Sequence, residues 1–238
     1  MTVSIKTVFE RTEKKYLITT EQRNLLLQKI DDKIMPDQYG KSTICSLYFD
    51  TDDYRLIRNS IDKPLYKEKL RLRSYSVPYD ESEVFLELKK KYKGVVYKRR
   101  KTMKYNSAKE YIYEHHLPDN SQIMKEIDWT VNFYKGLKPK MFIAYDRCAY
   151  FGIDDENLRI TFDMNIRYRT DKLTLSAGSF GEKIIDDDLC IMEIKALRAM
   201  PVWLCSILNE LKIYPSSFSK YGTAYKIVTQ NNGGYDCA

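Results

Sequence analysis

The chain has 238 residues, 43% of them hydrophobic, which is enough to fold one domain with a sizeable core. Forty Lys and Arg against 33 Asp and Glu leave a net charge of +7, which favours an anionic partner without distinguishing nucleic acid, lipid and phosphorylated metabolites. The five cysteines contain no CxxC pair, which argues against a disulfide framework or a zinc site. With no apolar run long enough to span a bilayer, we expect a cytoplasmic chain without a transmembrane segment.

Seven segments alternate between apolar and polar residues with period two, the pattern of strands with two different faces. In chain order they are residues 9–17, 67–73, 85–91, 95–103, 141–150, 158–169 and 190–197. Lys93 and Gly94 separate the third and fourth segments and predict a hairpin there.

Six further segments have apolar residues at helical spacing: 21–34, 52–60, 107–116, 121–134, 201–211 and 219–229. Thr19 and Gln22 are spaced as a capping box before the first, and Pro201 stands in the first turn of the fifth. We therefore expect a single domain over residues 1–238, with its core at about 9–229 and a flexible tail at 230–238.

The polar positions of the strands are mostly charged. In one strand this usually marks a solvated outer face. Seven such strands favour a barrel whose apolar residues are covered by helices and whose charged residues line the lumen, provided that a polyanion neutralises them. The alternative is a sandwich with one open basic face that binds RNA or anionic lipid. The 20 tyrosines fall on both faces of the strands, unlike the interleaved aromatics of nucleic-acid surfaces, so we expect no DNA partner.

The basic residues on these faces suit a triphosphate. Arginine grips two phosphate oxygens with its planar fork, whereas lysine acts as a point charge. Arg71, Arg73, Arg147 and Arg159 can therefore clamp successive phosphates. Because no Walker A loop, GxGxxG, HExxH or GxSxG motif is present, side chains must hold the phosphates.

Carboxylates share the same strand faces, namely Glu13, Glu87, Asp163 and Glu193. Oxygen ligands favour Mg²⁺ or Mn²⁺ that bridges carboxylates and phosphate oxygens. Each carboxylate can instead be an ion-pair partner that positions a neighbouring Lys or Arg, and for Asp163 the two interpretations stay equal. The two histidines, His115 and His116, are adjacent on a predicted helix and are expected at the surface.

Eight short motifs follow one another between residues 9 and 222: FERTEKKYL, YFDT, KEKLRLRSY, ELKKKYKGVVYKRR, YDRCAYFG, LRITFD, MEIKA and SSFSKYG. Glu13-x-Lys15 resembles the ExK signature of the triphosphate tunnel metalloenzymes. The ordered set resembles their VTC, or polyphosphate-polymerase, branch. This resemblance implies an α+β fold in which an antiparallel β-barrel forms a triphosphate tunnel with flanking helices. Compared with the full-length eukaryotic arrangement, we expect neither an SPX domain nor a membrane-spanning part.

The resemblance also implies an activity, namely transfer of the γ-phosphoryl group of ATP to a growing inorganic polyphosphate chain. The alternatives are a tunnel triphosphatase that hydrolyses nucleoside triphosphate or polyphosphate, and a non-catalytic module that binds polyphosphate or RNA. In the polymerase, positioning and charge neutralisation by Arg, Lys and metal carry the reaction. In the triphosphatase, water attacks instead, and a carboxylate or Lys must orient it.

By resemblance, phosphate-binding positions fall on Lys15, Arg71, Arg73, Lys89, Lys98, Arg100, Arg147, Arg159 and Lys220, and Mn²⁺ or Mg²⁺ is bound by Glu193 with Glu87. Lys195 is carried over as a substrate-binding residue. The strand faces add Lys69, Lys91 and Tyr145 as substrate-binding residues and Glu13 as a metal ligand. We assign catalysis to Lys15, Arg71, Arg73, Lys89, Arg147, Arg159 and Lys220. We also expect Arg71, Arg73, Lys89, Arg147, Arg159 and Glu193 to point into one enclosed cavity.

Overall fold

The fold was obtained as a computed structural model that describes residues 11–197 and 199–231. The strands are β1 (Arg11–Thr19), β2 (Ile34–Asp50), β3 (Tyr66–Ser74), β4 (Glu83–Tyr92), β5 (Val95–Lys104), β6 (Lys138–Gly152), β7 (Arg159–Arg169), β8 (Glu182–Lys183) and β9 (Leu189–Leu197). The helices are α1 (Thr20–Lys29), α2 (Arg55–Ile61), α3 (Tyr105–Glu114), α4 (Gln122–Phe133), α5 (Val202–Glu210) and α6 (Lys220–Asn231), with a 3₁₀ turn at Leu175–Ala177.

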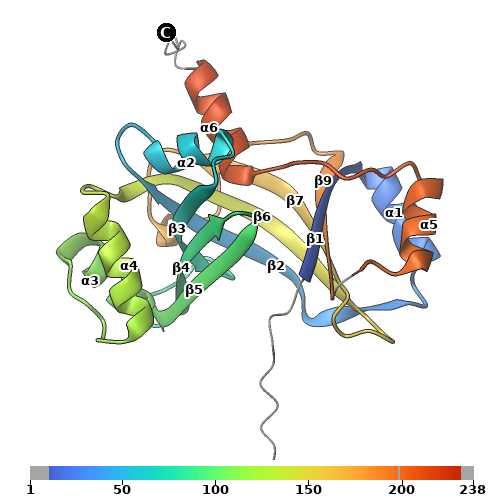
Figure 1. Cartoon of the computed structure of the whole chain (residues 1–238), viewed down its shortest axis with the longest axis horizontal. Helices are drawn as coiled ribbons and strands as arrows, with labels where there is room; N and C mark the ends of the chain where they lie inside the picture. The colour runs from blue at the N-terminus through green and yellow to red at the C-terminus, as the bar shows by residue number, and fades with distance from the viewer. Residues whose placement is uncertain (1–10, 198, 232–238) are drawn as a thin grey trace, which may run out of the picture. The chain divides into compact units, whose positions relative to one another are not determined.

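The strands of the described residues form one sheet in the order β1-β9-β7-β6-β2-β3-β4-β5, and β8 pairs with β7. The registered pairs β1/β9, β7/β9, β7/β8, β2/β3, β3/β4 and β4/β5 are all antiparallel. An antiparallel sheet with flanking helices confirms the predicted α+β class (Figure 1).

The described residues divide into two compact units. The first contains the chain up to Ser42, Asp146–Asn165 and Ile185–Phe218, and the second contains Thr43–Tyr145, Ile166–Ile184 and the chain from Ser219. The single domain expected from the sequence stays a prediction.

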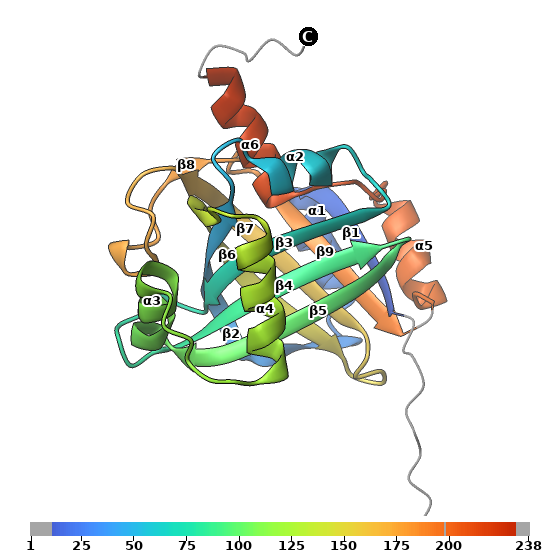
Figure 2. The same cartoon turned by 60° about the vertical axis from the view of Figure 1, so that its left-hand side comes forward.

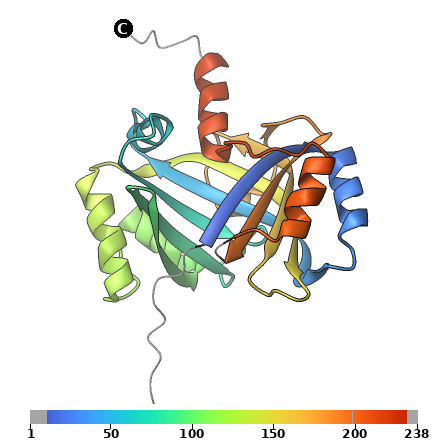
Figure 3. The same cartoon turned by 45° about the vertical axis from the view of Figure 1, so that its right-hand side comes forward.

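In the first unit, α1 and α5 lie side by side beside β1 and β9 (Figure 3). Tyr16 and Ile18 of β1 and Met192 and Ile194 of β9 are buried in the core that these helices cover. The capping box is confirmed, because Thr19 Oγ1 accepts from the Gln22 backbone N–H and Gln22 Oε1 accepts from the Thr19 N–H, each at 3.1 Å. The alternate residues of β1 and β9 are therefore left for the charged face.

In the second unit, α4 packs on β5 and α3 on both β4 and β5 (Figure 2). Leu70 and Leu72 of β3 share a core with Leu86 and Leu88 of β4, because alternate strand residues face the helices. The predicted hairpin is confirmed: β4 pairs with β5 around Lys93 and Gly94, whose φ values of 46° and 88° suit a tight hairpin turn.

One long strand was not predicted. β2 begins where the predicted first helix was expected to end, since α1 already stops at Lys29 and residues 30–33 form a turn. The first half of β2 is largely exposed, and Ile44–Asp50 is buried without interruption. A strand whose polar and apolar residues do not alternate carries no period-two signal, and periodicity alone cannot identify it.

Asp50, at the end of β2, is fully buried and joins three elements of the second unit. Its Oδ1 accepts from the backbone N–H of Leu56 at 2.8 Å, and its Oδ2 accepts from that of Ile57 at 3.0 Å. The hydroxyl of Tyr221 in α6 donates to Oδ2 at 2.8 Å. Burial raises the pKa of Asp50 although these hydrogen bonds oppose it. The carboxylate thus anchors the start of α2 and the start of α6.

We expect Asp50→Ala to lower the free energy of unfolding by about 2 kcal/mol, because it leaves the buried N–H groups of Leu56 and Ile57 and the Tyr221 hydroxyl without their acceptor. Tyr221→Phe should cost only about 1 kcal/mol, since it removes one hydrogen bond and keeps the ring. Urea denaturation of both variants measures this. Equal losses would show that Asp50 anchors nothing beyond Tyr221.

Candidate functional site

The second unit gathers basic side chains in rows across its strands. Tyr48, Arg71, Glu87 and Arg100 are directly opposite one another on β2, β3, β4 and β5. Directly opposite residues of antiparallel strands share a face, so this row forms one surface. The neighbouring row on the same face is Lys69, Lys89 and Lys98. We call Arg71, Arg73, Lys98 and Arg100 with Glu87 the basic cluster.

Glu87 is the centre of the basic cluster, with only 1% of its surface exposed. Its Oε2 receives Arg71 Nε at 2.8 Å and Nη2 at 2.7 Å, and Arg73 Nε lies 4.0 Å away. Its Oε1 receives Lys98 Nζ at 2.7 Å and Arg100 Nε at 2.7 Å. Burial alone raises the pKa of Glu87, but these cations hold it well below its usual range. Four cations around one carboxylate leave an excess of positive charge in a sheltered place, which favours an anionic ligand.

Three more predicted residues contact the basic cluster or its row. The Tyr145 hydroxyl accepts from Arg73 Nη2 at 3.1 Å, and Lys220 Nζ lies 4.4 Å from the centre of the Tyr145 ring. Lys69 Nζ donates to Ser219 Oγ at 3.2 Å. The first turn of α6 therefore reaches the same face as β3 and β6.

Lys89 and Lys91 extend this face along β4. Lys89 is opposite both Lys69 and Lys98, and Lys91 is opposite Lys67. Both side chains are exposed.

The first unit holds a second group, the carboxylate–lysine cluster, made of Glu13, Lys15, Glu193 and Lys195 on β1 and β9. Lys195 Nζ lies 2.7 Å from Glu193 and 4.0 Å from Glu13, and Lys15 Nζ lies 3.9 Å from each. The Glu193 side chain is 13% exposed, against 39% for Glu13. Burial raises the pKa of Glu193, but Lys195, Lys15 and Arg147 outweigh it and lower it overall.

Asp163 is paired with Arg147 through two hydrogen bonds, from Nε to Oδ1 at 2.6 Å and from Nη2 to Oδ2 at 2.8 Å. The carboxylate is buried, so it serves here as the positioning partner of Arg147. Arg159 is more open: its guanidinium donates to Asp37 Oδ2 at 2.9 Å, and its side chain is 54% exposed.

The carboxylate–lysine cluster fits a divalent cation. Glu13, Glu193 and the nearby Thr161 hydroxyl supply oxygen donors, and Thr161 Oγ1 is buried without a hydrogen-bond partner in the described residues. The two ammonium groups between the carboxylates show that cations are favoured there. Mg²⁺ is commonly bound by one or two carboxylates and by substrate phosphates. In residues 11–197 and 199–231, no group of three His, Cys, Asp or Glu is placed to hold an ion alone.

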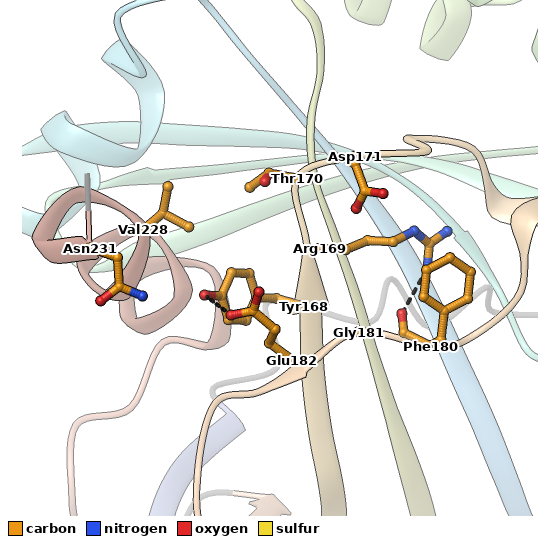
Figure 4. Close-up of a pocket in the computed structure, with 9 residues that line it drawn as sticks. All are labelled: Tyr168, Arg169, Thr170, Asp171, Phe180, Gly181, Glu182, Val228 and Asn231. Carbon is orange, nitrogen blue, oxygen red and sulfur yellow. Dashed lines mark hydrogen bonds between the residues drawn. The ribbon is translucent and has the colours of Figure 1, made fainter.

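A cavity of about 480 Å³ in the second unit lies beside Arg169, Phe180 and Glu182 (Figure 4). The Arg169 guanidinium is stacked between Phe142, at 3.5 Å, and Phe180, at 4.5 Å, and it donates to several backbone oxygens, including that of Phe180 at 2.9 Å. Arg169 thus holds its own loop in place. No predicted site residue lines this cavity.

Sequence reasoning missed the structural partners of the basic cluster. Tyr48 and Tyr221 stack with ring centres 4.6 Å apart, and Tyr48 accepts from Arg71 Nη1 at 3.2 Å. The signal that could have found them was the YFDT motif, in which Tyr48 and Asp50 are two residues apart and would share one face of a strand. The expected surface position of the histidines is confirmed, since both are exposed.

The family model for the VTC domain matches residues 10–229. The chain therefore belongs to the VTC domain family, which confirms the resemblance of its motifs. No curated protein matches the chain.

Solved structures with similar folds include a candidate adenylate cyclase from Bacillus halodurans, with a TM-score of 0.54, 16% identity, and coverage of 87% of this chain and 92% of that one. A protein from Pyrococcus horikoshii has a TM-score of 0.48 and 12% identity, covering 92% and 99%. A candidate adenylate cyclase from Vibrio parahaemolyticus has a TM-score of 0.45 and 12% identity, covering 91% and 98%. The first of these supports the fold assignment.

The family and the fold together support a triphosphate tunnel protein that acts on nucleotides or polyphosphate, by phosphoryl transfer or hydrolysis, and they imply dependence on a divalent metal. In the part of the chain that the structure describes, no helix has the length and apolar character of a membrane span.

Proposed function

We propose that the protein is a polyphosphate polymerase-like phosphotransferase, which moves the γ-phosphoryl group of ATP or another nucleoside triphosphate to the end of a polyphosphate chain. The observation that supports this proposal is the basic cluster. Four cations converge on the buried carboxylate of Glu87, and they carry more positive charge than it neutralises. A chain of phosphate groups supplies the missing negative charge.

In this proposal Glu87 is a counter-charge rather than a metal ligand, because basic side chains already bind both of its oxygens. It fixes the forks of Arg71 and Arg100 while other N–H groups of these forks stay available for phosphate oxygens. Arg71, Arg73, Lys15, Lys89, Arg147, Arg159 and Lys220 act on the transferred group, and Lys69, Lys91, Lys98, Arg100, Lys195 and Tyr145 bind the rest of the substrate. That they face one cavity stays a prediction.

Glu193 is proposed as the main ligand of Mg²⁺ or Mn²⁺, with Glu13 as a second carboxylate, since Glu193 is the more sheltered of the two. When bound, the divalent ion neutralises charge on the phosphate oxygens. Lys15 and Lys195 already hold these carboxylates in place and would position the phosphates beside them.

The reaction requires little acid–base chemistry from the protein. The terminal phosphate of the acceptor is already anionic, so no general base has to remove a proton from it. The transferring group develops charge on its outer oxygens, and Arg147, fixed by Asp163, is a preorganised donor of the kind that stabilises such charge. A triphosphatase would use the same residues with water as the acceptor.

The test is incubation of the full chain with ATP and either Mg²⁺ or Mn²⁺, followed by gel staining for polyphosphate and measurement of released orthophosphate. Polymer that forms only with metal, and is abolished by a chelator, is the expected result. Orthophosphate without polymer would replace the polymerase by a triphosphatase. If neither polyphosphate nor orthophosphate forms but the protein still binds polyphosphate, it is a non-catalytic binding module.

A further inference from the structure

The hydroxyl of Tyr48 lies within the surface formed by the basic cluster. Tyr48 is on β2, directly opposite Arg71, in the row that continues through Glu87 and Arg100. Arg71 Nη1 donates to the Tyr48 hydroxyl at 3.2 Å, and only 7% of Tyr48 is exposed. The phenol therefore touches one of the arginines proposed to bind phosphate.

The proton of this hydroxyl has no acceptor among the described residues. A phenol both accepts and donates, and here only its accepting function is used. The buried Tyr221 and Tyr111 differ, because each donates to a carboxylate, Asp50 at 2.8 Å and Asp128 at 3.1 Å. A sheltered donor without an acceptor is costly, so an acceptor from a ligand fits this position.

The charged groups that face Tyr48 are mainly cationic. Burial by itself raises the pKa of Tyr48, but Arg71, Arg73 and Lys69 on β3 outweigh it and lower the pKa to about 8. From α6, Tyr221 stacks on the ring, and its neutral hydroxyl donates a hydrogen bond to Asp50. From β4, Glu87 reaches Tyr48 only through Arg71. The same surroundings that favour phenolate in the free protein favour an anionic ligand oxygen.

We propose that the Tyr48 hydroxyl donates a hydrogen bond to a phosphate oxygen of the bound triphosphate or polyphosphate while it accepts from Arg71. This inference rests on the proposed function, because it adds a binding residue to the same site. Bound phosphate and phenolate repel each other, so the complex requires the neutral phenol. Tyr48 thereby offers the ligand a hydrogen-bond donor, and it couples binding to a proton.

The sign of the pH effect follows from this coupling. A bound anion raises the pKa of Tyr48 above its free value of about 8, so affinity is full below pH 8 and falls as the pH rises through it. Between pH 7 and pH 9 the loss approaches about tenfold, and one proton per ligand is taken up near pH 9.

The experiment is calorimetric titration of the full chain with inorganic tripolyphosphate at pH 7 and pH 9, in buffers of different ionisation enthalpy. Three proteins are compared: wild type, Tyr48→Phe, and Tyr111→Phe as a control for loss of a buried tyrosine hydroxyl. Tyr48→Phe should bind about tenfold or more weakly at pH 7, because one hydrogen bond to a charged group is lost. Wild type and Tyr111→Phe should take up a proton at pH 9, and Tyr48→Phe should not.

Titration of the ligand itself is common to all three proteins and cancels in the comparison. Unchanged affinity of Tyr48→Phe overturns the inference and leaves the proposed function standing. Weaker binding with wild-type proton uptake also overturns it, because Tyr48 would then only position Arg71. If wild type binds neither tripolyphosphate nor ATP, the proposed function fails and the inference with it.

Discussion

Glu87→Gln should lower the free energy of unfolding by about 3 to 5 kcal/mol, because the amide leaves Arg71, Arg73, Lys98 and Arg100 without their shared counter-charge. Loss of one partner from a buried ion-pair network costs more than the pair contributes, because the side chains of Arg71 and Arg73, only 22% and 10% exposed, stay largely desolvated. Thermal and urea unfolding of the variant at neutral pH measure this loss. The uncompensated positive charge of the four cations should also make tripolyphosphate stabilise Glu87→Gln more than it stabilises wild type, because the bound anion replaces the missing carboxylate.

The difference in free energy of unfolding between wild type and Glu87→Gln should depend on pH with a definite sign. The pKa of Glu87 is depressed in the folded state, so its contribution to stability is full above the unfolded value of about 4.3 and is lost as the pH falls below it. The gap between wild type and Glu87→Gln should therefore narrow in acid. A gap that stays constant down to pH 3 would contradict the ionised state of Glu87.

Glu68→Gln is a matched control. Glu68 is also buried on this sheet, but it accepts from the hydroxyls of Tyr66, at 3.0 Å, and Tyr134, at 2.5 Å, rather than from cations. Glu68→Gln should lower the free energy of unfolding less than Glu87→Gln does. Added tripolyphosphate should stabilise Glu68→Gln no more than it stabilises wild type. Equal loss and equal rescue in both variants would mean that the basic cluster is not the anion site.

Glu193→Gln should reduce metal-dependent turnover by about 100-fold or more while the protein stays folded. The substitution removes a negatively charged metal ligand but keeps the shape of the side chain. Its partner Lys195 is 40% exposed, so water can solvate the ammonium that the variant leaves unpaired. Steady-state rates over a range of Mn²⁺ concentrations, together with direct Mn²⁺ binding by electron paramagnetic resonance, measure the effect.

Glu210→Gln is the control in the same unit. Glu210 forms an exposed ion pair with Lys29 at 2.8 Å and is not proposed as a metal ligand. Such surface pairs contribute little to stability. Its turnover and Mn²⁺ affinity should match wild type. If Glu193→Gln behaves in the same way, Glu193 is not a metal ligand and the proposed metal site is wrong.

Local sequence patterns were sufficient for most of the fold. The alternation in β3, β4 and β9 predicted both their extent and which residues face the core, because a strand's period of two follows from backbone geometry alone. The capping box and the Lys93-Gly94 turn were predictable for the same reason, since each is made within a few residues. β2 was missed because Ile44–Asp50 is buried on both faces and has no alternation to detect.

By itself, the sequence determined which residues can carry phosphate and metal chemistry, since parity along each strand places Arg71, Glu87 and Glu193 on polar faces. It did not determine what each carboxylate does. Glu87 and Glu193 have the same residue type and the same parity, but strand pairing surrounds Glu87 with four cations and gives Glu193 two lysines. The charges that surround a buried group come from other strands, so only the tertiary structure shows which cations each carboxylate meets, and the roles of counter-charge and metal ligand stay proposals.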